Sequence, residues 1–325
     1  MLSKYIAAAA MVSTVAAQSP SFCDKYTTAL FTNNTAENQK TLLTAVVNTA
    51  VIGNYSESKT GMAVPGILAP GTVNGTPVNL LPYFNGGLAS SNRGGVAGVS
   101  INFLDDGGAA PLAMGKPANG TDSNQYMLLT HLYEYFGTLL GCSQQGMTGF
   151  EAYSGQGSQY NVHKFMDLSN AEVTYFISQV AAAAMSFGVS AEDLTPVGQA
   201  LTTLFGYRCA APATAVPAQG AQLQSICQAA DCPVAPMGNC TGLLNATEPS
   251  VAVSSLVPST STSANATASM TGTTAPTGTG AIAVPTADAV IFGVSFAAVI
   301  GGIAAALLLL MRSGGWGLED SIAGN

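Results

Sequence analysis

The chain has 325 residues, of which 48% are hydrophobic and only 8% are charged. A typical soluble protein is about 25% charged, and here 17 Asp and Glu against 9 Lys and Arg leave a net charge of −8. Because phosphate binding requires clustered cations, which this sequence lacks, the composition excludes a nucleic-acid partner.

Residues 1–17 have the layout of a secretory signal peptide. Lys4 precedes a short apolar run, and small residues occupy positions 15–17. The run is too short to span a bilayer as a permanent anchor. We therefore expect cleavage after Ala17 and entry into the secretory pathway.

Helical periodicity follows in several segments. Apolar residues recur at helical spacing over residues 41–52 and 126–140, and a glycine, Gly53 or Gly141, follows each segment. Ser169 with Glu172 three residues later predicts a capping box before helix 169–188. Ser190 begins a similar signal before residues 194–205. We therefore expect an all-α domain over residues 18–209.

A long insertion interrupts this helical pattern at residues 55–122. The segment is rich in Gly, Pro and Asn, which disfavours regular structure. Ordered pieces are expected at 80–84 and 99–104. A long irregular stretch inside a compact domain is typical of a functional cover.

Three segments are expected beyond the domain. Residues 210–249 contain cysteines and are interpreted as a disulfide-tied neck. Residues 250–288 are mainly Ser, Thr, Pro, Gly and Ala, which cannot bury a core, so they predict a disordered, O-glycosylated stalk. Residues 289–311 carry no charge and, at about 1.5 Å per residue, are long enough to span a roughly 30 Å hydrocarbon layer.

The membrane orientation follows from the flanks of this apolar segment. Arg312 and a short polar tail, 312–325, come directly after it, which predicts a type I membrane protein at the cell surface. A GPI attachment signal is the alternative, because small residues at 278–281 suit an attachment site. The polar tail favours the spanning helix.

The cysteines and the glycosylation triplets agree with export. An even number of cysteines in an exported segment predicts up to three disulfides, whose pairing is left open; the six are Cys23, Cys142, Cys209, Cys227, Cys232 and Cys240. Their spacing lacks the paired CxxC of a zinc site. N-x-S/T triplets, which suit a glycosylated ectodomain, begin at Asn33, Asn54, Asn74, Asn119, Asn239, Asn245 and Asn265.

Only two histidines occur in the chain. His131 falls within the apolar helix 126–140, and His163 lies shortly before the helix that Ser169 caps. Neutral imidazole is the commonest transition-metal ligand, and two imidazoles can hold one iron from opposite sides. The competing interpretation is a core histidine bonded to a backbone carbonyl and a second histidine on the surface.

The order of motifs between residues 41 and 205 resembles the truncated globin family, the two-over-two helical haem proteins. That family has an apolar helix, a Pro-Phe-Phe or Pro-Tyr-Phe turn, a helix ending in an aromatic pair and Leu-Gly-Gly, then Tyr-x-Gly, Val-His and a helix ending in Gly-Val. No single piece is specific, but the ordered series covers about half the chain. It runs through residues 42–52, Pro82-Tyr83-Phe84, Tyr135-Phe136, 139–142, Tyr153-Ser154-Gly155, Val162-His163, 169–187 and Gly188-Val189.

This resemblance implies haem b as the cofactor and His163 as the proximal iron ligand. Phe84 matches the phenylalanine that packs against the haem, and Leu128 and Leu132 match distal-pocket positions. His131 matches a position that in some members binds iron as a sixth ligand. We expect His163 to bind through Nε2 while its Nδ1–H donates to a carbonyl, which fixes the tautomer.

The chain also departs from the family pattern. Val51 stands near the position where many members have a distal Tyr, Leu132 stands where others have Gln, and Cys142 replaces the second glycine. Loss of the distal donors disfavours an oxygen store. Cys23 and Cys209 flank the domain, and a bridge between them would tie its ends.

Two functions of different class fit these observations. The first is a membrane-tethered, haem-binding globin-like ectodomain, whose role is electron transfer, NO or peroxide turnover, diatomic-ligand binding or haem capture. Any catalysis would then be haem-dependent redox chemistry with O2, NO or a redox partner. Lys164 would pair with a haem propionate; the alternative is a solvated surface lysine. The alternative is a cofactor-free, glycosylated surface protein with a structural or adhesive role in a cell wall of fungal type.

Overall fold

The computed structural model describes residues 20–55, 58–94, 98–241 and 243. The signal peptide expected at 1–17, the stalk at 250–288, the membrane span at 289–311 and the tail at 312–325 lie outside the described residues. Those that are described belong to the first of the two units into which the chain divides, Met1–Ala268. Within them, no helix is long and apolar enough to cross a membrane.

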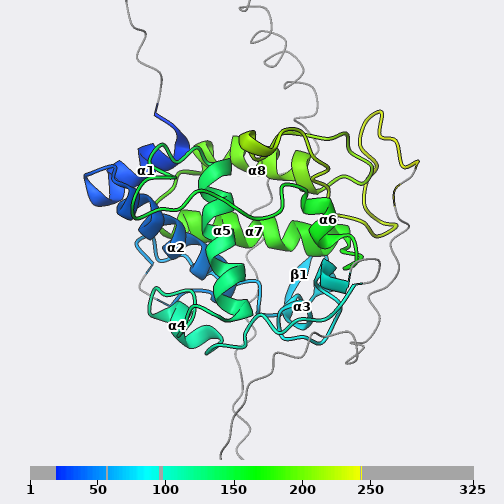
Figure 1. Ribbon diagram of the computed structural model, residues 1–325, viewed down its shortest axis with the longest axis horizontal. Helices are drawn as coiled ribbons and strands as arrows, with labels where there is room; N and C mark the ends of the chain where they lie inside the picture. Colours follow the sequence, from blue (N-terminus) through cyan, green and yellow to red (C-terminus); the bar gives the residue numbers. More distant parts are fainter. Residues whose placement is uncertain (1–19, 56–57, 95–97, 242, 244–325) are drawn as a thin grey trace, which may run out of the picture. The chain divides into compact units, whose positions relative to one another are not determined.

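Helices dominate the described part of the chain, so the expected all-α class is confirmed (Figure 1). The long helices are α1 (Phe22–Phe31), α2 (Ala36–Ile52), α5 (Asn124–Leu139), α7 (Asn170–Ser186) and α8 (Ala191–Phe205). The short ones are α3 (Leu81–Phe84), α4 (Ala109–Ala113) and α6 (Gln159–His163), with 3-10 turns at Asn92–Gly94 and Pro217–Gln219. Helix α2 packs against both α5 and α7, and α8 packs against α7.

The helix ends follow from local side-chain chemistry. Ser169 and Glu172 form both halves of the predicted capping box at α7, and Ser190 caps α8 as expected. Helix α2 ends at Ile52 as predicted, because Gly53 adopts a φ of +85°. A Cβ at Gly53 would lie 2.5 Å from the Pro65 carbonyl oxygen, so only glycine fits this turn.

The insertion at 55–122 is largely irregular but packed against the helices. The fully buried Gln125 side chain makes four hydrogen bonds to it, accepting from the amides of Asp106 and Gly108 and donating to the carbonyls of Gly108 and Pro117. A hairpin of β1 (Gly71–Val73) and β2 (Thr76–Val78) also forms within it. The piece expected at 80–84 is α3, and the piece at 99–104 forms isolated bridges to residues 85 and 91.

The segment expected to be a separate neck belongs to the domain. The core includes Ala215, Val216, Ile226, Cys227 and Cys232. Backbone amides of residues 226 and 227 donate to the Phe205 carbonyl, and those of residues 228 and 229 donate to the Leu168 carbonyl. The hydrophobic core therefore continues past the boundary expected at residue 209.

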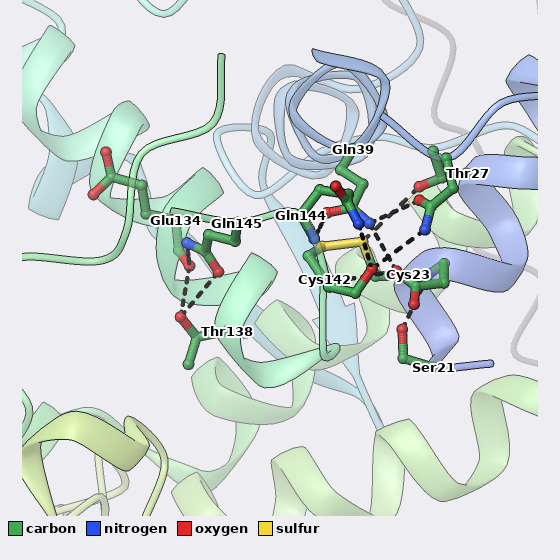
Figure 2. The surroundings of a disulfide bond; sticks show 12 residues. Ser21, Cys23, Thr27, Gln39, Glu134, Thr138, Cys142, Gln144 and Gln145 are labelled. Atoms are coloured by element: carbon green, nitrogen blue, oxygen red, sulfur yellow. Dashed lines mark hydrogen bonds between the residues drawn. A yellow bond between two sulfur atoms is a disulfide. The ribbon is translucent and has the colours of Figure 1, made fainter. Parts of the chain in front are cut away.

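Three disulfides join all six cysteines, as the even count predicts. The pairs are Cys23–Cys142, Cys209–Cys240 and Cys227–Cys232. The expected bridge between Cys23 and Cys209 is therefore wrong. Cys23 is bound instead to Cys142 in the turn after α5 (Figure 2). Its amide also donates to the Leu140 carbonyl at 3.1 Å.

Candidate functional site

A cavity of about 180 Å³ lies among the long helices. Its walls come from α1, α2, α5, α7 and α8, together with α3, α6 and the loops beside them, and most of the lining side chains are apolar. Protein interiors rarely contain voids much larger than a water molecule. At roughly 24 cal/mol per Å³, a cavity of this volume destabilises a fold by about 4 kcal/mol unless a ligand fills it. We therefore regard it as a candidate ligand site.

His163 lines this cavity at the C-terminal end of α6. Its Nδ1 lies 2.8 Å from the carbonyl oxygen of Gln159, one helical turn earlier. A carbonyl oxygen only accepts, so Nδ1 carries the proton, and the lone pair of the neutral ring is on Nε2. Burial lowers the pKa of His163, an effect that the Gln159 bond partly opposes, so the imidazole is neutral near pH 7. No hydrogen-bond partner of Nε2 is found among the described residues.

Other residues singled out from the sequence also line the cavity. Phe84 at the end of α3 contributes to the wall, as do Leu128 and Leu132, which lie one turn apart on α5. Val51, near the position of the family's distal Tyr, lines it from α2. The structure thus brings residues from four separate segments to the cavity that His163 lines.

His131 and Lys164 do not line the cavity. His131 is half-buried on α5, and its ring stands edge-on to Tyr153 with the ring centroids 6.0 Å apart. Burial lowers its pKa. Lys164 directs its ammonium to the Asn161 side-chain oxygen at 3.3 Å and over the Phe165 ring at 5.2 Å. The structure therefore does not bring the two histidines to a common site.

Three tyrosines of the cavity wall were not predicted as site residues. The Tyr26 hydroxyl donates to the Asp193 carboxylate, the Tyr83 hydroxyl to the Met166 carbonyl, and the Tyr135 hydroxyl to the Gln224 side-chain oxygen. Their rings contribute apolar wall while these hydroxyl protons point to other protein groups. Their place in the wall depends on hydrogen-bond partners that lie far away in the sequence. The spacing of residues along the chain therefore could not predict it.

A half-buried carboxyl group, that of Glu134, lies one turn beyond His131 on the same helix. Oε2 of Glu134 is buried and lacks a hydrogen-bond partner among the described residues. Burial and the nearby Glu151 raise the pKa of Glu134 to about 7, against the opposing effects of Lys40 and the Ser154 amide. The Glu134 carbonyl accepts a hydrogen bond from Gln145, which connects this turn of α5 to the following loop (Figure 2).

This raised pKa makes stability depend on pH. A carboxyl whose pKa is higher in the folded than in the unfolded state stabilises the fold below about pH 4.5, and this contribution is lost as pH rises through 7. Allowing for solvent screening of a partly exposed group, we expect Glu134→Gln to be more stable than the wild type by about 1–2 kcal/mol at pH 8. At pH 4, below the ordinary pKa of the group, the two should be equal in urea unfolding. Parallel pH profiles for the two proteins would contradict this assignment.

The fold and site define a helical domain with a histidine at the wall of an apolar cavity. No family model, curated protein or solved structure matches the chain. The geometry of the cavity is therefore the guide to its function.

Proposed function

We propose that the domain binds haem b in its apolar cavity, where His163 would hold the iron, in a globin-like arrangement of helices. The observation that carries this proposal is the tautomer of His163. Its Nδ1–H is held by the Gln159 carbonyl, so the basic Nε2 is the nitrogen available to a ligand. A hydrogen bond of this kind orients an imidazole and strengthens it as a metal donor.

The residues of the cavity fit such a group. Within the described residues there is no cluster of three or more His, Cys, Asp or Glu side chains suited to a bare metal ion. Haem iron needs no such cluster, because the porphyrin supplies four ligands and one histidine suffices to hold it. Phe84, Leu128 and Leu132 offer an apolar surface that would exclude water from the ring.

The wall of the cavity favours some functions of a bound haem over others. Bound haem would supply an iron centre that exchanges electrons or binds small ligands. The tyrosine hydroxyls at the wall donate to Asp193, Met166 and Gln224, so they do not offer donors to a ligand inside the cavity. This favours electron transfer, NO or peroxide turnover, or haem capture over oxygen storage.

Lys164 is proposed as the partner of a haem propionate. It follows His163 directly, and its ammonium is within hydrogen-bond reach of Asn161 rather than paired with a carboxylate. The described ion pairs involve Lys25 and Lys40 instead. A charged ammonium beside the His163 end of the cavity suits an anionic group.

An extracellular, membrane-tethered location is part of the same proposal. Three disulfides are typical of an oxidising compartment. The acceptor asparagines within the described residues all have exposed side chains: Asn33, Asn54, Asn74, Asn119 and Asn239. The orientation as a type I protein, with a GPI anchor as the alternative, depends on the segments at 1–17 and 289–311.

A haem titration of the full-length protein, purified without added haem, tests the proposal. We expect a red-shifted Soret band that saturates at one haem per chain. A chain that stays colourless under these conditions contradicts haem binding and leaves the cofactor-free surface protein as the better interpretation.

A further inference from the structure

The cavity is long compared with the reach of one histidine. Its lining runs along α7 from Glu172 to Ala184, which at about 1.5 Å per residue is roughly 18 Å. His163 lies at the Glu172 end, because only residues 164–169 separate the end of α6 from the N-terminus of α7. Helix α1 and helix α6 lie on opposite sides of α5 (Figure 1). The cavity thus has a His163 end and an opposite end between α1 and α8.

The opposite end, here called the α1–α8 compartment, is lined by apolar side chains and one tyrosine. We assign to it six of the cavity-lining residues, which are Phe22, Tyr26, Ala184, Val189, Leu194 and Val197. The one hydroxyl in this set, on Tyr26, donates to Asp193 and accepts from the Ser190 amide at 3.1 Å. A ligand in the compartment would therefore contact apolar atoms, and these six residues offer it no free hydrogen-bond donor or acceptor.

The wall formed by α1 is fixed on two sides. On one side Cys23 is bound to Cys142 (Figure 2), and Asp24 accepts from the Ser143 amide at 3.1 Å. On the other side Lys25 pairs with Asp193 at 2.6 Å. Because a cavity persists only where its walls cannot collapse, these restraints make the compartment a preformed feature.

We infer that the α1–α8 compartment binds a small, neutral, apolar organic molecule beside the group held by His163. Apolar cavities in proteins stay dry and take up small molecules such as benzene or xenon, whereas a polar molecule would lose its hydrogen bonds to water on entering. The inference deepens the proposed function, because it names the class of molecule that would lie next to the haem. Its physical basis is the compartment itself, which exists whether or not haem binds.

Benzene is a suitable probe for the compartment. The full-length protein in lipid nanodiscs, with methyl groups isotopically labelled, would be titrated with benzene in the haem-free and haem-loaded forms. We expect saturable shifts of the Val189, Leu194 and Val197 methyl resonances in both forms. Absence of saturable shifts, or their loss on haem loading, would overturn the inference.

Filling variants distinguish the two ends of the cavity. Val197→Phe, which fills the compartment, should weaken benzene binding at least tenfold and leave the haem titration unchanged. The matched variant Leu128→Phe fills the His163 end and should leave benzene binding within twofold of the wild type. If Val197→Phe does not fold, Ala184→Val serves as the smaller filler with the same expectation. Wild-type benzene affinity in the folded filler would overturn the assignment.

His163→Ala separates this inference from the proposed function. We expect the variant to lose haem affinity and keep benzene affinity. A wild-type protein that binds benzene but no haem would support the compartment and refute the proposed function. A wild-type protein that binds haem but no benzene would support the proposed function and refute the compartment.

Discussion

Replacing His163 with alanine should lower haem affinity at least 100-fold. Changes to groups that merely orient a metal-bound histidine cost about 10–100-fold in affinity, and removal of the ligand itself should cost more. The apolar wall, including Phe84 and Leu128, would remain and retain weak hydrophobic binding. A Soret titration of the full-length variant measures the loss directly.

Two comparisons show whether the effect is local to the ligand. Added imidazole should restore part of the Soret band in His163→Ala, because the ligand enters the space that the side chain leaves. His131→Ala is the matched control and should bind haem within twofold of the wild type with an unchanged spin state, since His131 packs on Tyr153 outside the cavity. A change from low to high spin in the control would instead identify His131 as the sixth ligand.

Removal of the Cys23–Cys142 disulfide should cause the largest loss of stability. The two cysteines are 119 residues apart in the sequence, and a loop of that length gives about 5 kcal/mol of stabilisation in the chain-entropy relation. Domains typically have about 5–15 kcal/mol in total. We therefore expect Cys23→Ala/Cys142→Ala to lower the denaturant midpoint severely, measured by circular dichroism in urea.

The chain provides its own control for this double substitution. Cys227 and Cys232 are separated by 5 residues, for which the same relation gives about 2 kcal/mol. Both pairs are buried, so the two double variants lose similar packing but very different loop constraints. Equal destabilisation by the two would show that local packing, rather than chain constraint, accounts for the effect of the long-range bridge.

Local signals explain how much of the fold could be predicted. The capping box of Ser169 and Glu172, the Ser190 cap and the stop at Gly53 are all encoded within a few residues, and the structure confirms them. Helix α1 was not predicted, although Ser21 caps it through the Asp24 amide. The hairpin was also missed, and its signal was the dipeptide Asn74-Gly75, whose two residues both have positive φ.

The features that could not be predicted depend on contacts between distant parts of the chain. The pairing of Cys23 with Cys142 and the four hydrogen bonds of Gln125 depend on how segments meet in space. For the candidate site, the prediction that His163 bonds a carbonyl through Nδ1 is confirmed, because its partner is one helical turn away. That His163 lies at the cavity and His131 outside it required the tertiary structure.

The Cys209–Cys240 bridge has a mechanical consequence. A pull on the chain beyond Cys240 crosses the bridge directly to Cys209, shortly after the end of α8, and bypasses the 31-residue separation between them. Tension therefore enters the helical body without passing through Ile226, which lines the cavity, or Gln224, which holds Tyr135. The Cys209–Cys240 disulfide therefore keeps force applied at the C-terminal side of the domain from reaching this part of the cavity wall.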